Sequence, residues 1–122
     1  MIARIPSLEF LHSLCGSFVG ADGLVSLRIW RCGYGVALDL TDGGKSTLCG
    51  VAGACGSGVE CFIQFGLPNV TRTVGTLLNE STLSLAAEEP RIELRLSRQE
   101  GGLVATIALD GKAKVAYALV VV

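Results

Sequence analysis

The five cysteines offer the widest range of chemistry in this sequence. They stand at positions 15, 32, 49, 55 and 61 of the 122 residues. Thiolates bind zinc and carry redox chemistry, and Cys49, Cys55 and Cys61 are the candidates for such a site. However, no CxxC pair occurs, and zinc sites need four cysteine or histidine ligands at closer spacing. An odd number of cysteines without a secretory signal also argues against a disulfide framework. We therefore expect no metal, no cofactor and no disulfide.

A second candidate for chemistry is the pair formed by His12 and Cys15. His12 is the single histidine of the chain, and on a helix it would lie one turn from Cys15, within reach as base and nucleophile. Such a pair needs a third group to orient the base, and Glu9 is the one nearby acidic residue. Because no convergent polar cluster accompanies the pair, the sequence predicts no catalytic residue.

A third candidate is the run Asp42-Gly43-Gly44-Lys45-Ser46-Thr47, which contains the GK[ST] end of a phosphate-binding loop. The full pattern requires a glycine at position 39, where this chain has Asp39, and a helix that follows the loop. The residues that follow alternate as in a strand, so the run predicts a hairpin turn. Asn69 and Asn79 match the glycosylation pattern, but without a secretory signal we expect both to be unmodified.

Composition and charge exclude several classes of partner. The net charge is −1 and 17% of the residues are charged, with no basic patch of the kind that binds nucleic acid. The first fifteen residues lack the apolar segment of a signal peptide, and no apolar run is long enough for a transmembrane helix. We expect a single domain over residues 1–122, without nucleic-acid or membrane partners, and cytoplasmic unless a leader peptide has been removed.

The elements that position these residues are mostly strands, because apolar residues alternate with polar ones from about position 24 onward. Val25, Leu27 and Ile29 show this period, as do Leu94 and its neighbours, and it is typical of strands with one face on a core. The alternation predicts an all-β fold, a small antiparallel up-and-down β-barrel or curled meander of eight to ten strands. A two-sheet β-sandwich is the alternative. The expected core consists of Val25, Leu27, Ile29, Val36, Leu38, Ile63, Phe65, Ile92, Leu94, Leu96 and Ile107.

One short helix is expected before the strands, over about residues 7–15. Ser7 is a suitable N-cap, Leu8, Leu11 and Leu14 follow at helical spacing, and Gly16 ends the segment. Strands then run from about 16 to 121, although the span 76–89 could be partly helical.

Loop lengths that keep apolar residues on one face predict the hairpin registers. We expect a two-residue loop at 32–33 and three-residue loops at 42–44 and 109–111. The resulting partners are Ile29 with Val36, Leu38 with Leu48, and Ile107 with Ala113.

The motif Gly16-x-Phe18, followed by a series of hairpins, resembles the opening of calycin-type barrels, the group of lipocalins, avidins and certain bacterial protease inhibitors. Their first strand begins with Gly-x-Trp, whereas this chain has phenylalanine at the aromatic position. The resemblance implies a barrel with a ligand cavity or an inhibitory surface rather than catalysis. It assigns no binding residue.

The last predicted strand, Val115–Val122, is apolar on both faces apart from the Tyr117 hydroxyl. A strand of this kind must be covered on both sides, and a barrel has one interior. Either the N-terminal helix lies outside the barrel and covers the strand, or a partner subunit does. We expect a homo-oligomer, most simply a dimer, with Ala118, Val120 and Val122 in or beside the contact. The predicted function is a non-catalytic protein-interaction or self-assembling module. The alternatives are a barrel whose lumen, left partly empty by Gly and Ala, binds a small apolar ligand, and an enzyme without a recognisable motif.

Overall fold

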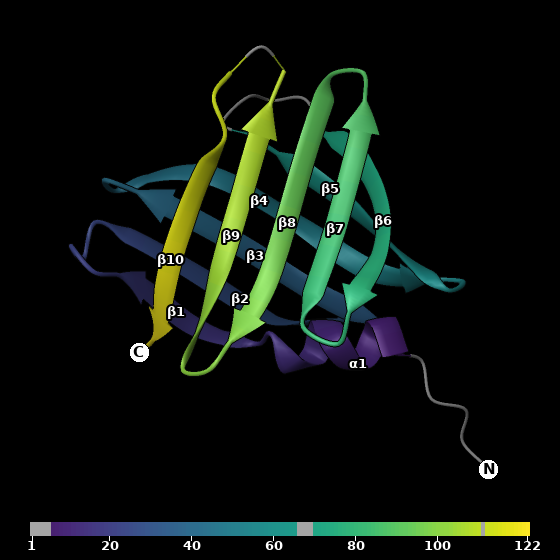
Figure 1. Ribbon diagram of the computed structural model, residues 1–122, viewed down its shortest axis with the longest axis horizontal. Coiled ribbons are helices and arrows are strands. Elements are labelled where there is room, and N and C mark those ends of the chain that lie inside the picture. Colours follow the sequence, from purple (N-terminus) through teal and green to yellow (C-terminus); the bar gives the residue numbers. More distant parts are fainter. Residues whose placement is uncertain (1–5, 66–69, 111) are drawn as a thin grey trace.

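Over its described residues, the protein is an antiparallel β-barrel of ten strands with one short helix (Figure 1). The computed structural model describes residues 6–65, 70–110 and 112–122. Each strand pairs with the next in sequence, and the last pairs with the first. The up-and-down barrel is therefore confirmed, and the β-sandwich alternative is wrong because the first and last strands are hydrogen-bonded to each other. The elements are α1 (Pro6–Ser13), β1 (Gly16–Gly20), β2 (Val25–Cys32), β3 (Gly35–Asp42), β4 (Lys45–Cys55), β5 (Gly58–Gln64), β6 (Thr71–Asn79), β7 (Thr82–Glu88), β8 (Arg91–Gln99), β9 (Gly102–Leu109) and β10 (Val115–Val121).

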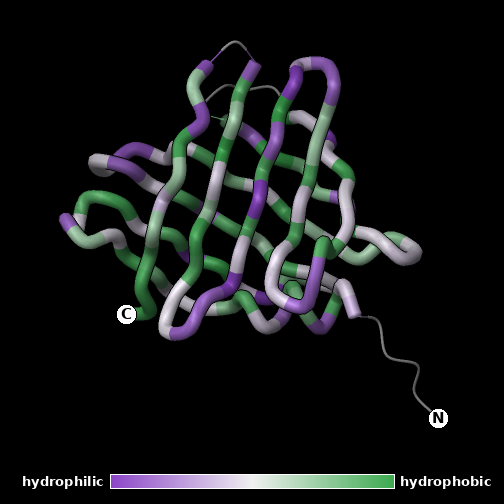
Figure 2. The backbone as a smooth tube through the Cα atoms, viewed as in Figure 1, coloured by the Kyte–Doolittle hydropathy of each residue, from purple (hydrophilic) through white to green (hydrophobic). Residues whose placement is uncertain are grey.

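The barrel is flattened into two layers, with β6–β10 in front in Figure 1 and β1–β5 crossing obliquely behind them. Apolar and polar residues alternate along most of the strands (Figure 2). The buried apolar residues form one core cluster between the layers. Ile63 and Leu83 are 0% exposed there, and Leu94 is 2% exposed. The core therefore occupies the lumen of the barrel.

Nine of the eleven predicted core residues are buried, and the other two are half-buried against the core. Val25 is the first residue of β2, and Phe65 directly follows β5, so both lie at the ends of strands, where the core is less completely covered. The confirmed residues are Leu27, Ile29, Val36, Leu38, Ile63, Ile92, Leu94, Leu96 and Ile107.

Helix α1 packs against β3 and β4 and covers one end of the barrel. Phe10, Leu11 and Leu14 are buried there. The helix begins at Pro6, so Ser7 lies within its first turn rather than capping it. The buried Ser7 Oγ has no hydrogen-bond partner among the residues that the structure describes. The expected short N-terminal helix is thus present, with its end at Ser13 instead of position 15.

The first two predicted hairpin registers are wrong. Ile29 pairs with Leu38 around a two-residue turn at Gly33-Tyr34, where Gly33 has a φ of 56°. A positive φ at the first of two central residues is the type II′ arrangement. Leu38 pairs with Gly50, because the second turn has two residues, 43–44, and a β-bulge follows Leu40.

The last hairpin is also shifted by two residues, since Ile107 pairs with Val115. Its loop includes position 111, which lies outside the described residues, as does the glycosylation candidate Asn69. The span 76–89 is not helical, because β6 continues to Asn79 and β7 covers Thr82–Glu88. In the first and last hairpins the two-residue shift leaves every side chain on its predicted face.

Candidate functional site

The outer face of β10 is apolar and exposed. Ala118 is exposed, and Val120 and Val122 are 56% and 79% exposed. On the neighbouring strands, Val19 of β1 lies opposite Val120, and Val104 of β9 lies opposite Ala118. We call these five residues the C-terminal patch. The structure thus places all three predicted interface residues on one outward surface, which carries no charged side chain of its own.

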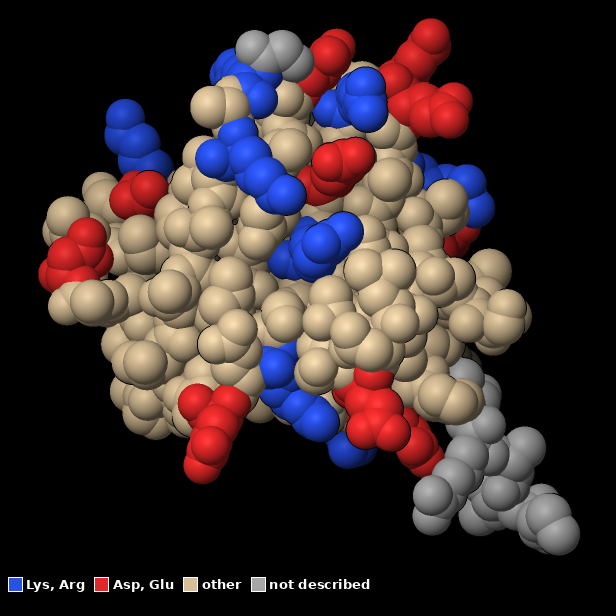
Figure 3. Space-filling view, viewed as in Figure 1, with Lys and Arg blue, Asp and Glu red and all other residues tan. Residues whose placement is uncertain are grey.

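The inner face of β10 is covered along its middle but not at its ends. Leu119 is 4% exposed and Tyr117 is half-buried, whereas Val115 and Val121 are 46% and 55% exposed. Helix α1 lies against β3 and β4 at the barrel end and leaves the C-terminal patch bare. Figure 3 shows the result, a broad uncharged surface over β10 beside a column of charged side chains over β8.

The pairing of β1 with β10, which we call the closure seam, is short. It consists of three residue pairs, Phe18 with Val121, Val19 with Val120, and Gly20 with Leu119. The range 115–118 of β10 has register partners in β9 alone among the described residues. Part of one edge of β10 therefore lies unpaired next to the C-terminal patch.

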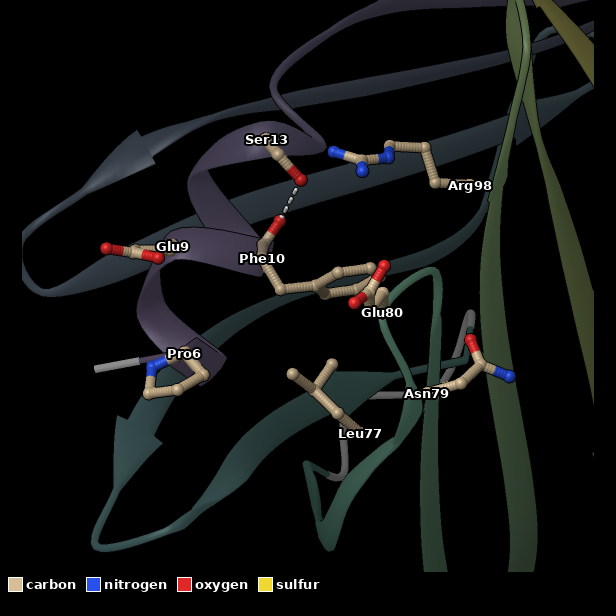
Figure 4. Close-up of a pocket in the computed structure, with 8 residues that line it drawn as sticks. All are labelled: Pro6, Glu9, Phe10, Ser13, Leu77, Asn79, Glu80 and Arg98. Atoms are coloured by element: carbon tan, nitrogen blue, oxygen red, sulfur yellow. Dashed lines mark hydrogen bonds between the residues drawn. The ribbon is translucent and has the colours of Figure 1, made fainter. Parts of the chain in front are cut away.

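A pocket of about 520 Å³ lies at the barrel end that α1 covers (Figure 4). We call it the mouth pocket. Phe10 points into it from the helix, Leu77 from β6 and Arg98 from β8. Sequence reasoning did not find it, because no local pattern brings these three segments together. Its lining is completed by Pro6, Glu9, Ser13, Asn79 and Glu80.

The three cysteines considered for a metal or redox site do not converge. Cys61 faces the lumen on β5 and is 0% exposed, while Cys49 and Cys55 lie on the outer face of β4. Burial raises the pKa of the Cys61 thiol to about 11, although the Thr73 hydroxyl acts in the opposite direction. All five cysteines lie in the described part of the chain and are free thiols.

His12 and Cys15 do not have the properties of a base and an activated nucleophile. The buried His12 Nε2 has no hydrogen-bond partner among the described residues, and the Cys15 backbone N–H donates to the His12 carbonyl at 3.3 Å. Partial burial raises the pKa of the Cys15 thiol, with the Arg31 guanidinium acting against it. A raised pKa lowers the thiolate fraction that nucleophilic attack requires.

The phosphate-loop candidate is a hairpin turn, as expected. Lys45 and Ser46 begin β4, and the Ser46 hydroxyl donates to Asp39 at 3.0 Å. The Asn79 side chain at the β6–β7 turn accepts a hydrogen bond from the Ser81 backbone N–H at 2.8 Å.

Comparison of the chain with protein-family models, curated proteins and solved structures gave no match. The resemblance to calycin-type proteins therefore extends to a closed antiparallel β-barrel and no further. Within the described residues, no helix has the length and apolar character needed to cross a membrane.

Proposed function

We propose that the protein is a non-catalytic interaction module that assembles with a second copy of itself through the C-terminal patch. The observation that carries the proposal is the exposure of Val120 and Val122, at 56% and 79%, on a surface without charged residues. Contiguous exposed apolar surface of this kind is typical of protein–protein contacts.

The shape of the patch favours a second copy of the same barrel. Its side chains are alanine and valine only, so two such walls can approach as closely as the sheets of a β-sandwich, about 10 Å apart. A two-fold axis through the patch would place β10 of each copy on the other, which is the isologous arrangement of most dimers. The unpaired part of the β10 edge adds backbone groups beside the same contact.

The runner-up function, a carrier of a small apolar ligand, needs free space inside the barrel. Inward side chains such as Ile63, Leu83 and Leu85, each at most 1% exposed, occupy the lumen. This packing favours self-assembly over storage of a ligand among the strands.

Sedimentation velocity from low to high micromolar concentration tests the proposal. We expect the wild type to sediment as a dimer, and the double variant Ala118→Lys, Val120→Glu to sediment as a monomer. The matched control swaps two outward charges on β8, Glu93→Lys with Arg95→Glu, and should leave the dimer unchanged. A milder variant, Val104→Lys, should weaken the dimer if the double variant does not fold. A monomeric wild type at high micromolar concentration would overturn the proposal.

A further inference from the structure

We infer that the mouth pocket binds a small zwitterion with an apolar chain, the chemistry of a short apolar peptide with free amino and carboxyl ends. This inference is independent of self-assembly, because the pocket lies between α1, the β6–β7 turn and β8. Its volume of about 520 Å³ falls within the range of small-molecule sites, which often occupy the mouths of β-barrels.

The apolar part of the pocket suits a hydrocarbon chain. The Phe10 ring extends from the helix toward the centre of the pocket, and Leu77 lies below it, facing Pro6 (Figure 4). Phe10 is 4% exposed and Leu77 packs against the core, so both positions are fixed by the barrel. Because the Phe10 ring is nearly covered, a ligand chain would contact mainly half-buried Leu77 and exposed Pro6. It would lose contact with water there without rearrangement of the protein.

Three charged residues line the pocket, Glu9, Glu80 and Arg98. Glu9 is not free, so Arg98 and Glu80 are the two opposite charges that have no ion pair within the described residues. Arg98 contributes its side chain from β8, and Glu80 contributes its side chain from the β6–β7 turn (Figure 4). The Arg98 backbone N–H donates to the Ser81 carbonyl at 2.7 Å, which holds β8 against the turn that carries Glu80.

These charges determine which ligand fits. Guanidinium groups bind carboxylates through two parallel hydrogen bonds, and Glu80 can accept hydrogen bonds from an ammonium group. A ligand with a carboxylate alone would be repelled by Glu80, and a ligand with an ammonium alone would be repelled by Arg98. The three remaining polar residues of the lining are already engaged. Glu9 is not free, the Ser13 Oγ donates to the Phe10 carbonyl at 2.6 Å, and the Asn79 Oδ1 accepts from Ser81. A zwitterion satisfies both charges at once.

The test is a titration of the full chain with the dipeptide Leu-Leu at millimolar concentration, followed by amide chemical shifts in ¹⁵N-labelled protein. We expect the shifts to move at Phe10, Leu77, Glu80 and Arg98. The variants Arg98→Gln and Glu80→Gln should each weaken binding by about tenfold or more. The control variants Arg95→Gln and Glu93→Gln, on the outer face of β8, should bind as the wild type does.

Capped peptides separate charge recognition from a general structural effect. Leu-Leu-amide should bind the wild type about tenfold more weakly than Leu-Leu, while the Arg98→Gln variant should bind both equally. N-acetyl-Leu-Leu should likewise bind the wild type about tenfold more weakly than Leu-Leu, while the Glu80→Gln variant should bind both equally. The absence of shifts at the pocket, equal losses from capping in wild type and variant, or equally tight binding of hexanoate or hexylamine would overturn the inference.

Discussion

Strands β8 and β10 both pair with β9, yet they present opposite surfaces to the outside. The inner face of β8 buries Ile92, Leu94 and Leu96, and that of β10 buries Leu119. The outer face of β8 carries exposed Arg91, Glu93 and Arg95, whereas that of β10 is alanine and valine. The two strands fit the same barrel because only the inward positions determine packing of the core.

The two faces of a barrel strand are therefore subject to separate requirements. Inward apolar residues at every second position are sufficient for a strand to pack on the core, whatever the outward residues are. Charged outward residues, as on β8, favour contact with water, and uncharged ones, as on β10, favour contact with another protein. Substitutions on each face should therefore change different properties.

The largest expected effect comes from truncating an inward residue of β8. Leu94 is 2% exposed, so Leu94→Ala removes packed atoms and leaves a cavity, at a cost of about 2–5 kcal/mol in the free energy of unfolding. The matched change on β10, Val121→Ala, concerns a residue that is 55% exposed and should cost less than about 1 kcal/mol. Chemical denaturation measures both, and equal losses would contradict the difference in burial between Leu94 and Val121.

The next effect is a dependence of stability on pH. It arises from Cys61, an inward residue of β5 in the layer opposite β8. The Cys61 pKa is raised from 9.0 to about 11, so the unfolded chain loses this proton at lower pH than the folded one. The contribution of the Cys61 thiol to the free energy of unfolding is fully present below pH 9. It is lost as pH rises toward 11, a change of about 2–3 kcal/mol. Denaturation of wild type and Cys61→Ala across this window should show a steeper decline in the wild type. Parallel curves would contradict the assignment.

An intermediate effect is expected when the outer face of β8 is made to resemble that of β10. The double variant Glu93→Val, Arg95→Val should change the free energy of unfolding by less than about 1 kcal/mol. It should nevertheless associate more readily than the wild type, because the outer face of β8 would then be uncharged like that of β10. Light scattering as a function of concentration measures this. Unchanged mass at high micromolar concentration would show that outward charge on β8 does not control association.

The smallest effect concerns the inner face of β10, at Tyr117. Partial burial, and to a lesser degree the Asp42 carboxylate, raise the pKa of Tyr117 above 10.0. With Tyr34→Phe as background, Tyr117 is the single tyrosine that titrates. Adding Asp42→Asn should shift its ultraviolet titration to lower pH, and an unchanged curve would rule out the contribution of Asp42. Because the folded-state pKa is raised, any stability linked to this group is present below pH 10 and declines above it.

The sequence predicts which residues of each strand face the core far better than it predicts the registers in which the strands pair. Alternation alone places Leu27, Ile29 and Leu94 in the core. In Val115–Val122, which is apolar on both faces, it shows only that Ala118 and Val120 share one face. It cannot distinguish registers that differ by two residues, since each keeps the same faces. Turn conformation decides between them, and this depends on which of several adjacent small or polar residues takes a positive φ, as Gly33 does.

The mouth pocket could not be predicted from the sequence for a different reason. Phe10, Leu77 and Arg98 come from distant segments, and they meet only after the barrel has closed and α1 has covered its end. The C-terminal patch, by contrast, was found because its central residues belong to one strand. Sites built from one element can be read from a local pattern, and sites built from several require the complete topology.

The closure seam also affects how the protein is made. Its three residue pairs join strands from nearly opposite ends of the described chain, whereas β8 and β9 share eight pairs across one tight turn. Bringing such distant segments together carries the largest entropy cost of any strand pairing here. During synthesis on the ribosome, the edge of β1 that pairs with β10 therefore stays unpaired until β10 has emerged. In the finished protein, the amide hydrogens of the seam should exchange with solvent sooner than those between β8 and β9.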